Sequence, residues 1–137
     1  MMKSEQINGM NLPGKLVTAL VEGPPTFAGA RWHDVFPVNE VVSPKLYSLS
    51  LVRKVNEKWW SETHPAFVGV ADGRAFPGAL IPSRSVLIGE LQGDAMIALD
   101  YRSGDDSPSV TYLNSDGRWV AVAQSFDEFW SQLVENK

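Results

Sequence analysis

Two histidines are the residues of this chain best suited to metal binding, and they stand far apart. His33 adjoins Asp34, and His64 precedes Pro65 in a segment expected to be a loop. Protein metal sites usually draw their ligands from closely spaced pairs or from one cluster of histidines, cysteines and carboxylates. These two histidines share no such motif, so the sequence predicts surface or loop positions for them and no metal site.

Four aspartates have the chemistry for acid–base work or for holding a cation. Residues 100–106 lack the ligand rhythm of a calcium-binding loop. Asp94 and Asp100 stand at the ends of predicted strands, where capping of a turn is the expected role. Asp105 and Asp106 lie on a predicted loop tip, where they are either solvated or exposed for a partner.

The many serines form no known catalytic pattern. The chain contains no Gly-x-Ser-x-Gly nucleophile elbow, no Ser-x-x-Lys pair and no phosphate-binding Gly-x-x-x-x-Gly-Lys loop. The sequence therefore predicts no catalytic residues, no cofactor and no enzymatic activity.

Composition and charge narrow the class of protein further. With 137 residues, 44% of them hydrophobic, the chain is long enough for one domain with its own core. The formal net charge of −4 argues against a nucleic-acid partner held through its phosphates. No apolar run approaches the roughly 20 residues of a membrane helix. The chain has no cysteine, and no apolar segment follows its first residues, so we expect a cytoplasmic protein without a secretory signal.

The clearest structural pattern is a run of four short apolar segments separated by turn residues. Gly93 and Gly117 are suited to the turns, and Asp94 can hydrogen-bond its own backbone there. Connections this short can join only antiparallel neighbours. The pattern predicts an antiparallel meander with strands near 85–91, 95–101, 109–113 and 118–123.

Three helices are predicted to flank this sheet, near 13–22, 44–61 and 126–135. The last begins with the capping box Ser125-Phe126-Asp127-Glu128, and its apolar stripe includes Phe126, Phe129 and Trp130. The first residues of 44–61 alternate like a strand, so whether 44–52 is helix or strand stays open. The resulting fold class is α+β, with a polar arm over 1–10 and one domain over 11–137. Three smaller elements are expected in addition: an edge strand over 31–36, a short strand over 67–71 and a connector over 76–82.

Five tryptophans make the chain rich in this residue, and most of them are expected in the core. Trp119 and Trp130 are assigned structural roles. Trp59 and Trp60 are adjacent on a predicted helix, so they cannot both face inward, and an exposed Trp60 would be a natural interface anchor. Basic residues near this pair would also suit single-stranded nucleic acid, but three of them in an acidic protein are a weak signal.

The C-terminal half of the chain resembles the SUKH superfamily. This is the domain of the fungal Smi/Knr cell-wall-assembly regulators and of many bacterial immunity proteins. The resemblance rests on the order and spacing of segments over about the last 60 residues, and it is loose before them. Where the family often has an Asn-Gly pair after its first helix, this chain has Glu22-Gly23-Pro24-Pro25. The segments that carry the resemblance are Ile81-Pro82-Ser83, Val86-Leu87-Ile88-Gly89, Gly93-Asp94, Ile97-Ala98-Leu99-Asp100, Val110-Thr111-Tyr112-Leu113, Trp119-Val120-Ala121-Val122-Ala123 and Ser125-Phe126-Asp127-Glu128-Phe129.

The resemblance implies a non-catalytic α+β domain, and for a bacterial member an immunity protein that neutralises a toxin domain by binding it. A regulatory or scaffolding module of the Smi/Knr type is the alternative, and a small metal-dependent enzyme is a more distant one. A nuclease toxin would be a basic partner, and opposite charge would speed the encounter. The candidate contact residues are Asp94, Tyr101, Asp105, Asp106 and Trp60.

Overall fold

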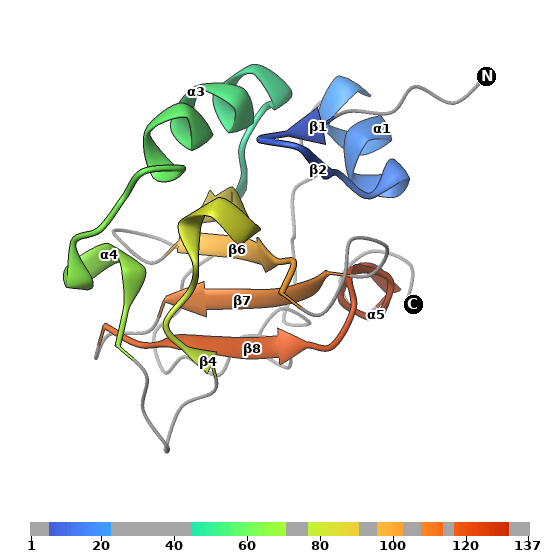
Figure 1. Cartoon of the computed structure of the whole chain (residues 1–137). Coiled ribbons are helices and arrows are strands. Elements are labelled where there is room, and N and C mark those ends of the chain that lie inside the picture. Colours follow the sequence, from blue (N-terminus) through green and yellow to red (C-terminus); the bar gives the residue numbers. More distant parts are fainter. Residues whose placement is uncertain are drawn as a thin grey trace.

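A computed structural model describes residues 6–22, 45–70, 77–90, 96–102, 108–113 and 117–131 of the chain. Its centre is a six-stranded antiparallel sheet with the strand order β3-β5-β6-β7-β8-β4 (Figure 1). With the helices around it, this is the predicted single-domain α+β fold. The strands are β3 (Lys45–Leu46), β4 (Pro77–Gly78), β5 (Ser85–Glu90), β6 (Met96–Asp100), β7 (Ser109–Leu113) and β8 (Trp119–Ala123).

Strands β5 to β8 form the predicted meander, and their bounds differ from the predicted ones by about one residue. Gly117 has the positive φ expected of a turn glycine, +75°. Two register shifts interrupt the ladder, one at Ile88 of β5 and one at Val122 of β8. The turn that holds Gly93 lies outside the described residues. Most residues of β5, β6 and β7 are buried, so both faces of this part of the sheet are covered.

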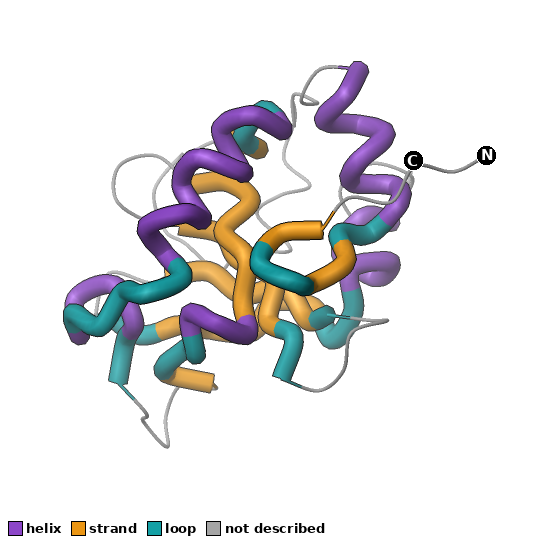
Figure 2. Tube along the Cα trace, turned by 45° about the horizontal axis from the view of Figure 1, so that its top comes forward, coloured by secondary structure: helices purple, strands orange, loops and turns teal. Residues whose placement is uncertain are grey.

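The helices are α1 (Gly14–Glu22), α3 (Leu49–Trp59), α4 (Pro65–Val68) and α5 (Phe126–Trp130), with a 3₁₀ turn η1 (Pro82–Arg84) before β5. Helix α3 packs on β5 and α1, whereas α5 packs on β7 and β8 (Figures 1 and 2). The predicted helix over 44–61 begins late, because residues 45–46 are paired with β5 as strand β3. Ser48 then caps α3, its hydroxyl accepting a hydrogen bond from the Leu51 N–H at 3.3 Å.

Helix α3 also completes the outer edge of β5 beyond the short β3. The side chain of Asn56 is 1% exposed and faces Leu87 of β5. Its amide nitrogen donates to the Leu87 carbonyl and its oxygen accepts from the Leu87 N–H, both at 2.9 Å. The same nitrogen donates to the Val52 carbonyl at 2.7 Å. One side chain therefore takes the place of a neighbouring strand at this position.

The N-terminal prediction was wrong over residues 6–10. These residues belong to a hairpin of β1 (Gln6–Ile7) and β2 (Met10–Asn11), and not to a polar arm. Asn8 and Gly9 form its turn with φ of 53° and 85°, and Asn-Gly is the strongest local signal for such a turn. Ile7 and Met10 are buried, which ties the hairpin to the core. Residues 1–5 lie outside the described residues.

The short strand predicted over 67–71 was also wrong. Residues 65–68 form helix α4 instead, and Gly69 then makes a single bridge to Ala79. A side chain at Gly69 would come within 2.3 Å of the Gly78 carbonyl, and its φ is +85°, so only glycine fits there. The predicted connector over 76–82 contains β4 at 77–78. The edge strand predicted over 31–36 lies outside the described residues.

The final helix is confirmed at its start. The Ser125 hydroxyl accepts a hydrogen bond from the Glu128 N–H at 3.1 Å. Phe126, Phe129 and Trp130 are buried, and the rings of Phe126 and Trp130 stack with centroids 5.4 Å apart. The predicted end of this helix at 135 lies outside the described residues.

Candidate functional site

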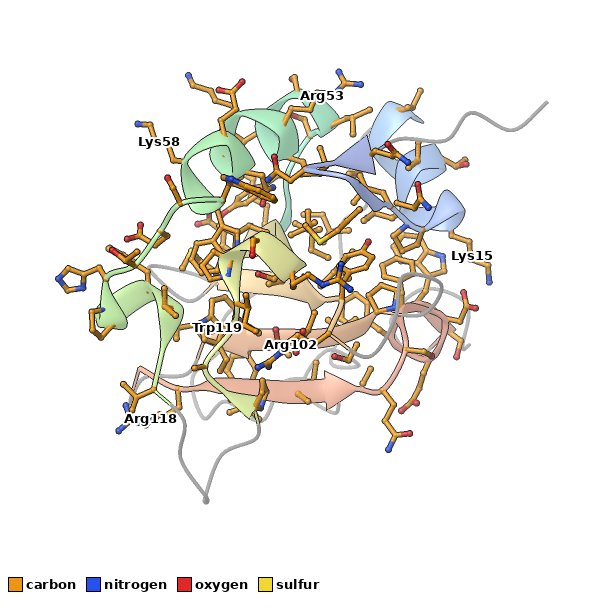
Figure 3. The ribbon with its side chains drawn as sticks, in the orientation of Figure 1. Lys15, Arg53, Lys58, Arg102, Arg118 and Trp119 are labelled. Atoms are coloured by element: carbon orange, nitrogen blue, oxygen red, sulfur yellow. The ribbon has the colours of Figure 1, made fainter. Side chains whose placement is uncertain are left out.

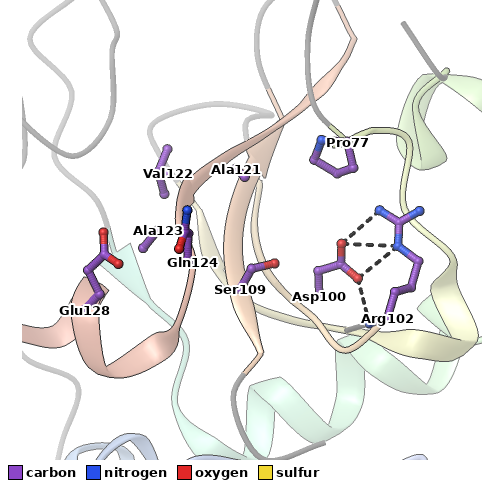
Figure 4. A pocket seen from close by; sticks show the side chains of 9 residues that line it. All are labelled: Pro77, Asp100, Arg102, Ser109, Ala121, Val122, Ala123, Gln124 and Glu128. Carbon is purple, nitrogen blue, oxygen red and sulfur yellow. Dashed lines mark hydrogen bonds and ion pairs between the residues drawn. The ribbon is translucent and has the colours of Figure 1, made fainter. Parts of the chain in front are cut away.

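An open cavity lies at the edge of the sheet where β6 and β8 end and β7 begins, close to α5. Polar residues from the three strands lie side by side along this cavity, because the strand register pairs them. Asp100 is paired with Ser109, and the pairing of Val110 with Ala123 places Gln124 beside Ser109. The cavity has a volume of about 660 Å³, within the range of about 300–1,000 Å³ typical of ligand sites. Its described lining residues, shown in Figure 4, are Pro77, Asp100, Arg102, Ser109, Ala121, Val122, Ala123, Gln124 and Glu128.

An ion pair occupies one end of this cavity. The Arg102 guanidinium donates to Asp100 through Nε, at 3.1 and 3.2 Å, and through Nη2 at 2.8 Å. Asp100 Oδ1 also accepts from the Arg102 backbone N–H at 3.1 Å, which is the turn-capping role predicted for this residue. Arg102 Nη2 reaches the Ala79 carbonyl as well, at 3.0 Å. The positive charge of Arg102 is therefore committed to Asp100.

The rest of the cavity is hollow because its floor carries small side chains. Ala121 and Ala123 come from β8 on either side of the bulged Val122, and Ser109 comes from β7. Glu128 stands at the end opposite the ion pair, on α5, and it is exposed to solvent (Figure 4). The described residues of the cavity therefore present a small apolar floor between the Asp100–Arg102 ion pair and the exposed carboxylate of Glu128.

Exposed apolar side chains form a second surface feature, at the end of α3, on α4 and on the segments that follow α4 and precede η1. Four large apolar residues are exposed here by about the same fraction: Trp60 46%, Phe67 44%, Val70 45% and Ile81 45%. We call these four residues the apolar corner. Single exposed apolar residues are common, but several large ones on adjoining segments are typical of interaction sites.

The apolar corner is held by buried tryptophans beneath it. The Trp59 indole donates to the Ser85 hydroxyl at 2.9 Å, and this hydroxyl donates to the Ile81 carbonyl at 2.8 Å. The Trp119 indole donates to the Phe67 carbonyl at 2.8 Å. The Trp59 and Trp119 rings lie 6.0 Å apart, and Figure 3 places Trp119 inside the molecule. The backbones of Ile81 and Phe67 are thereby fixed to the core, and Trp60 directly follows the buried Trp59 on α3.

The structure shows the exposure of two residues of the predicted contact set, Trp60 and Tyr101. Of the adjacent tryptophans, Trp59 is 3% exposed and Trp60 is the exposed one, as required of an anchor. Tyr101 was a wrong choice, because its side chain is fully buried and its hydroxyl donates to the Asn11 carbonyl at 2.6 Å. The remaining predicted contacts, Asp94, Asp105 and Asp106, lie outside the described residues.

The described ionisable groups show two marked perturbations. Burial, reinforced by the negative charge of Glu90 and a hydrogen bond to it, raises the pKa of Tyr47 to about 12. Burial alone raises the pKa of Tyr112. Both phenols remain protonated at neutral pH, and that of Tyr47 donates a hydrogen bond to Glu90.

The structure describes one of the two histidines, His64. His64 is exposed, with its ring 5.7 Å from that of Phe67, and His33 lies outside the described residues. Within the described ranges, no three histidine or carboxylate side chains are grouped so as to hold a metal ion.

The cavity-lining residues Arg102, Ser109, Gln124 and Glu128 were not singled out from the sequence. Their positions depend on which strand ends meet, and the signal available was the pairing of polar residues at the ends of consecutive strands. Two of the basic residues near the adjacent tryptophans, Arg53 and Lys58, extend outward from α3 (Figure 3). Of the two tryptophans, only Trp60 is exposed.

The fold and these two surface features define a single-domain α+β protein. None of its described helices has the length and apolar character needed to cross a bilayer. Comparison of the chain with protein-family models, with curated proteins and with solved structures gives no significant match.

Proposed function

We propose that this protein is a non-catalytic binding protein of the SUKH immunity type, which neutralises a toxin domain by covering part of its surface. The observation that carries the proposal is the apolar corner, in which Trp60 and Phe67 are exposed on backbone that is fixed to the core. The α+β fold and the resemblance of the C-terminal segments to immunity proteins support it. The absence of cysteine suits a reducing compartment, and we propose a cytoplasmic location.

An exposed tryptophan on a rigid support is a strong basis for an interface. Interface energies concentrate in a few residues, tryptophan foremost among them, and truncating such an anchor typically costs about 2 kcal/mol or more. That loss corresponds to a Kd raised roughly 30-fold. A support that is already ordered loses little conformational entropy on binding. Trp60 is therefore the residue whose removal is expected to weaken the complex most.

Co-expression with the toxic domain encoded by the neighbouring gene tests the proposal. Cells that express both proteins should survive, and the Trp60→Ala variant should protect them poorly while keeping a wild-type circular dichroism spectrum. Val21→Ala is the matched control, because Val21 is a more exposed apolar residue, 66%, on helix α1, which carries no residue of the apolar corner. Death of cells that express both wild-type proteins would refute the proposal for that partner.

Direct binding measurements separate this function from a scaffolding role. An immunity protein should bind one toxin domain tightly and in a 1:1 complex. Several partners of modest affinity, each insensitive to Trp60→Ala, would contradict the immunity function and favour a regulatory module.

A further inference from the structure

We propose that the cavity between Asp100 and Glu128 binds a basic group on an aliphatic stem, the chemistry of an arginine or lysine side chain. The proposal deepens the proposed function and rests on it in one respect, since we assign the side chain to the protein partner. The cavity would then act as a specificity pocket beside the anchoring role of the apolar corner.

Charge gives the first argument. Three of the described lining residues are charged, namely Asp100, Arg102 and Glu128. Asp100 and Arg102 neutralise one another through several hydrogen bonds, at distances of 2.8 to 3.2 Å. The Glu128 carboxylate remains, so these residues together leave one negative charge in the cavity. A monocation is the ligand that compensates it.

The Asp100–Arg102 ion pair also disfavours an anionic ligand. An anionic ligand would find the Nε and Nη2 groups of Arg102 already donating to Asp100, and pairing fully with the guanidinium would require drawing it away from Asp100. Asp100 is only 7% exposed, and a carboxylate left unpaired in such a position costs several kcal/mol. A cation meets no equivalent penalty from the ion pair, because Glu128 is exposed and can turn toward the cation while Asp100 and Arg102 stay paired.

The shape of the floor gives the second argument. Ala121, Val122 and Ala123 offer methyl groups along β8, and Pro77 offers its ring from the other side (Figure 4). Arginine and lysine bury their methylene stems along such surfaces while their heads stay with polar groups. Gln124, between this floor and Glu128, supplies a neutral oxygen that can accept from the head group. The cavity therefore matches both halves of a basic side chain.

An NMR titration of the full chain with Nα-acetyl-arginine amide tests the proposal without any toxin. We expect shifts in the backbone amides of Ala121, Ala123 and Gln124. Nα-acetyl-citrulline amide has nearly the same shape without the charge, and it should cause much smaller shifts. Glu128→Gln should weaken arginine binding about fivefold, the effect of one exposed ion pair. Asp127→Asn, which removes an exposed carboxylate one residue away, is the matched control and should bind like the wild type.

Three outcomes would overturn the proposal: equal shifts with citrulline, unchanged binding by Glu128→Gln, or no shift in these residues. Agmatine is a free small molecule with the same basic group, so it distinguishes a small-molecule ligand from a side chain of a protein partner. Binding of agmatine tenfold tighter than the capped arginine would overturn the assignment of the group to a side chain. The titration and the co-expression assay fail independently, because the first concerns only the cavity and the second only protection by the whole surface.

Discussion

Replacing Asn56 is expected to destabilise the fold more than any other single polar change in α3. Its side chain is 1% exposed and closes the edge of β5 with two hydrogen bonds to Leu87, both at 2.9 Å, while a third, at 2.7 Å, goes to the Val52 carbonyl of α3. Asn56→Ala leaves the N–H and the carbonyl of Leu87 without partners. Each buried unsatisfied group costs about 1–3 kcal/mol. We expect a loss of about 3–5 kcal/mol, a large share of the 5–15 kcal/mol typical of a domain.

Asn56→Asp is a more specific test, because it replaces only the side-chain nitrogen, a hydrogen-bond donor, by an oxygen, which is an acceptor when ionised. The amide nitrogen that donates to the carbonyls of Val52 and Leu87 becomes an oxygen facing both of them. Burial and these carbonyls raise the pKa of the new carboxyl above the value of about 3.9 in the unfolded chain. The folded state then binds the proton more tightly than the unfolded chain does. The stability of the variant therefore falls as the pH rises from about 3.9 through the raised pKa of the folded state. The variant should be closest to wild type near pH 4 and least stable near pH 7.

Urea unfolding followed by far-ultraviolet circular dichroism measures both effects. Glu57→Ala, the next residue of the same helix and exposed, is the control and should change the free energy of unfolding by less than about 0.5 kcal/mol. A loss for Asn56→Ala no larger than that of the control would refute the role assigned to this side chain. So would a penalty for Asn56→Asp that does not depend on pH.

Three further changes test other parts of the fold. Tyr47→Phe should remove part of the loss of stability at alkaline pH. Burial and Glu90 raise the pKa of Tyr47 to about 12 in the folded state, so the protonated phenol stabilises the fold below pH 10 and this stabilisation is lost as the pH rises to 12. The wild type, but not the variant, should therefore lose about 2–3 kcal/mol from this group between unfolding curves at the two pH values. Gly89→Ala would bring a methyl group within 2.4 Å of the Lys45 carbonyl, and a loss of about 2–3 kcal/mol with faster hydrogen exchange in β3 is expected. Phe129→Ala, at a fully buried position, should cost about 3–5 kcal/mol in thermal or urea unfolding, and a loss below 1 kcal/mol would mean that α5 does not cover the core.

The elements that were predictable from the sequence are those encoded by neighbouring residues. The meander was predicted because turn residues such as Gly117 separate short apolar runs, and α5 because Ser125 begins a capping box. The hairpin at Asn8-Gly9 was equally local, and its turn signal was overlooked in a stretch that reads as polar. Helix α4 was missed because an apolar run of four or five residues has the composition of both a buried strand and a helix.

The candidate site was less predictable, because it depends on contacts between distant segments. Tyr101 is the last residue of the predicted strand over 95–101 and looks like a surface residue, yet it is buried and its hydroxyl donates a hydrogen bond to the Asn11 carbonyl of the N-terminal hairpin. Asn56 reads as a polar residue of an exposed helix face until β5 is placed beneath it. The cavity requires Asp100, Ser109 and Gln124 to share one row, which only the strand register shows.

The unequal placement of the tryptophans has a spectroscopic consequence. Among those in the described residues, only Trp60 has an indole open to water, whereas Trp59, Trp119 and Trp130 are at most 7% exposed. The fluorescence of Trp60 should therefore have its emission maximum at a longer wavelength than that of the three buried tryptophans, and acrylamide should quench it first. A partner that covers it would shift this component to the blue, so the protein carries its own optical reporter of complex formation and needs no added label.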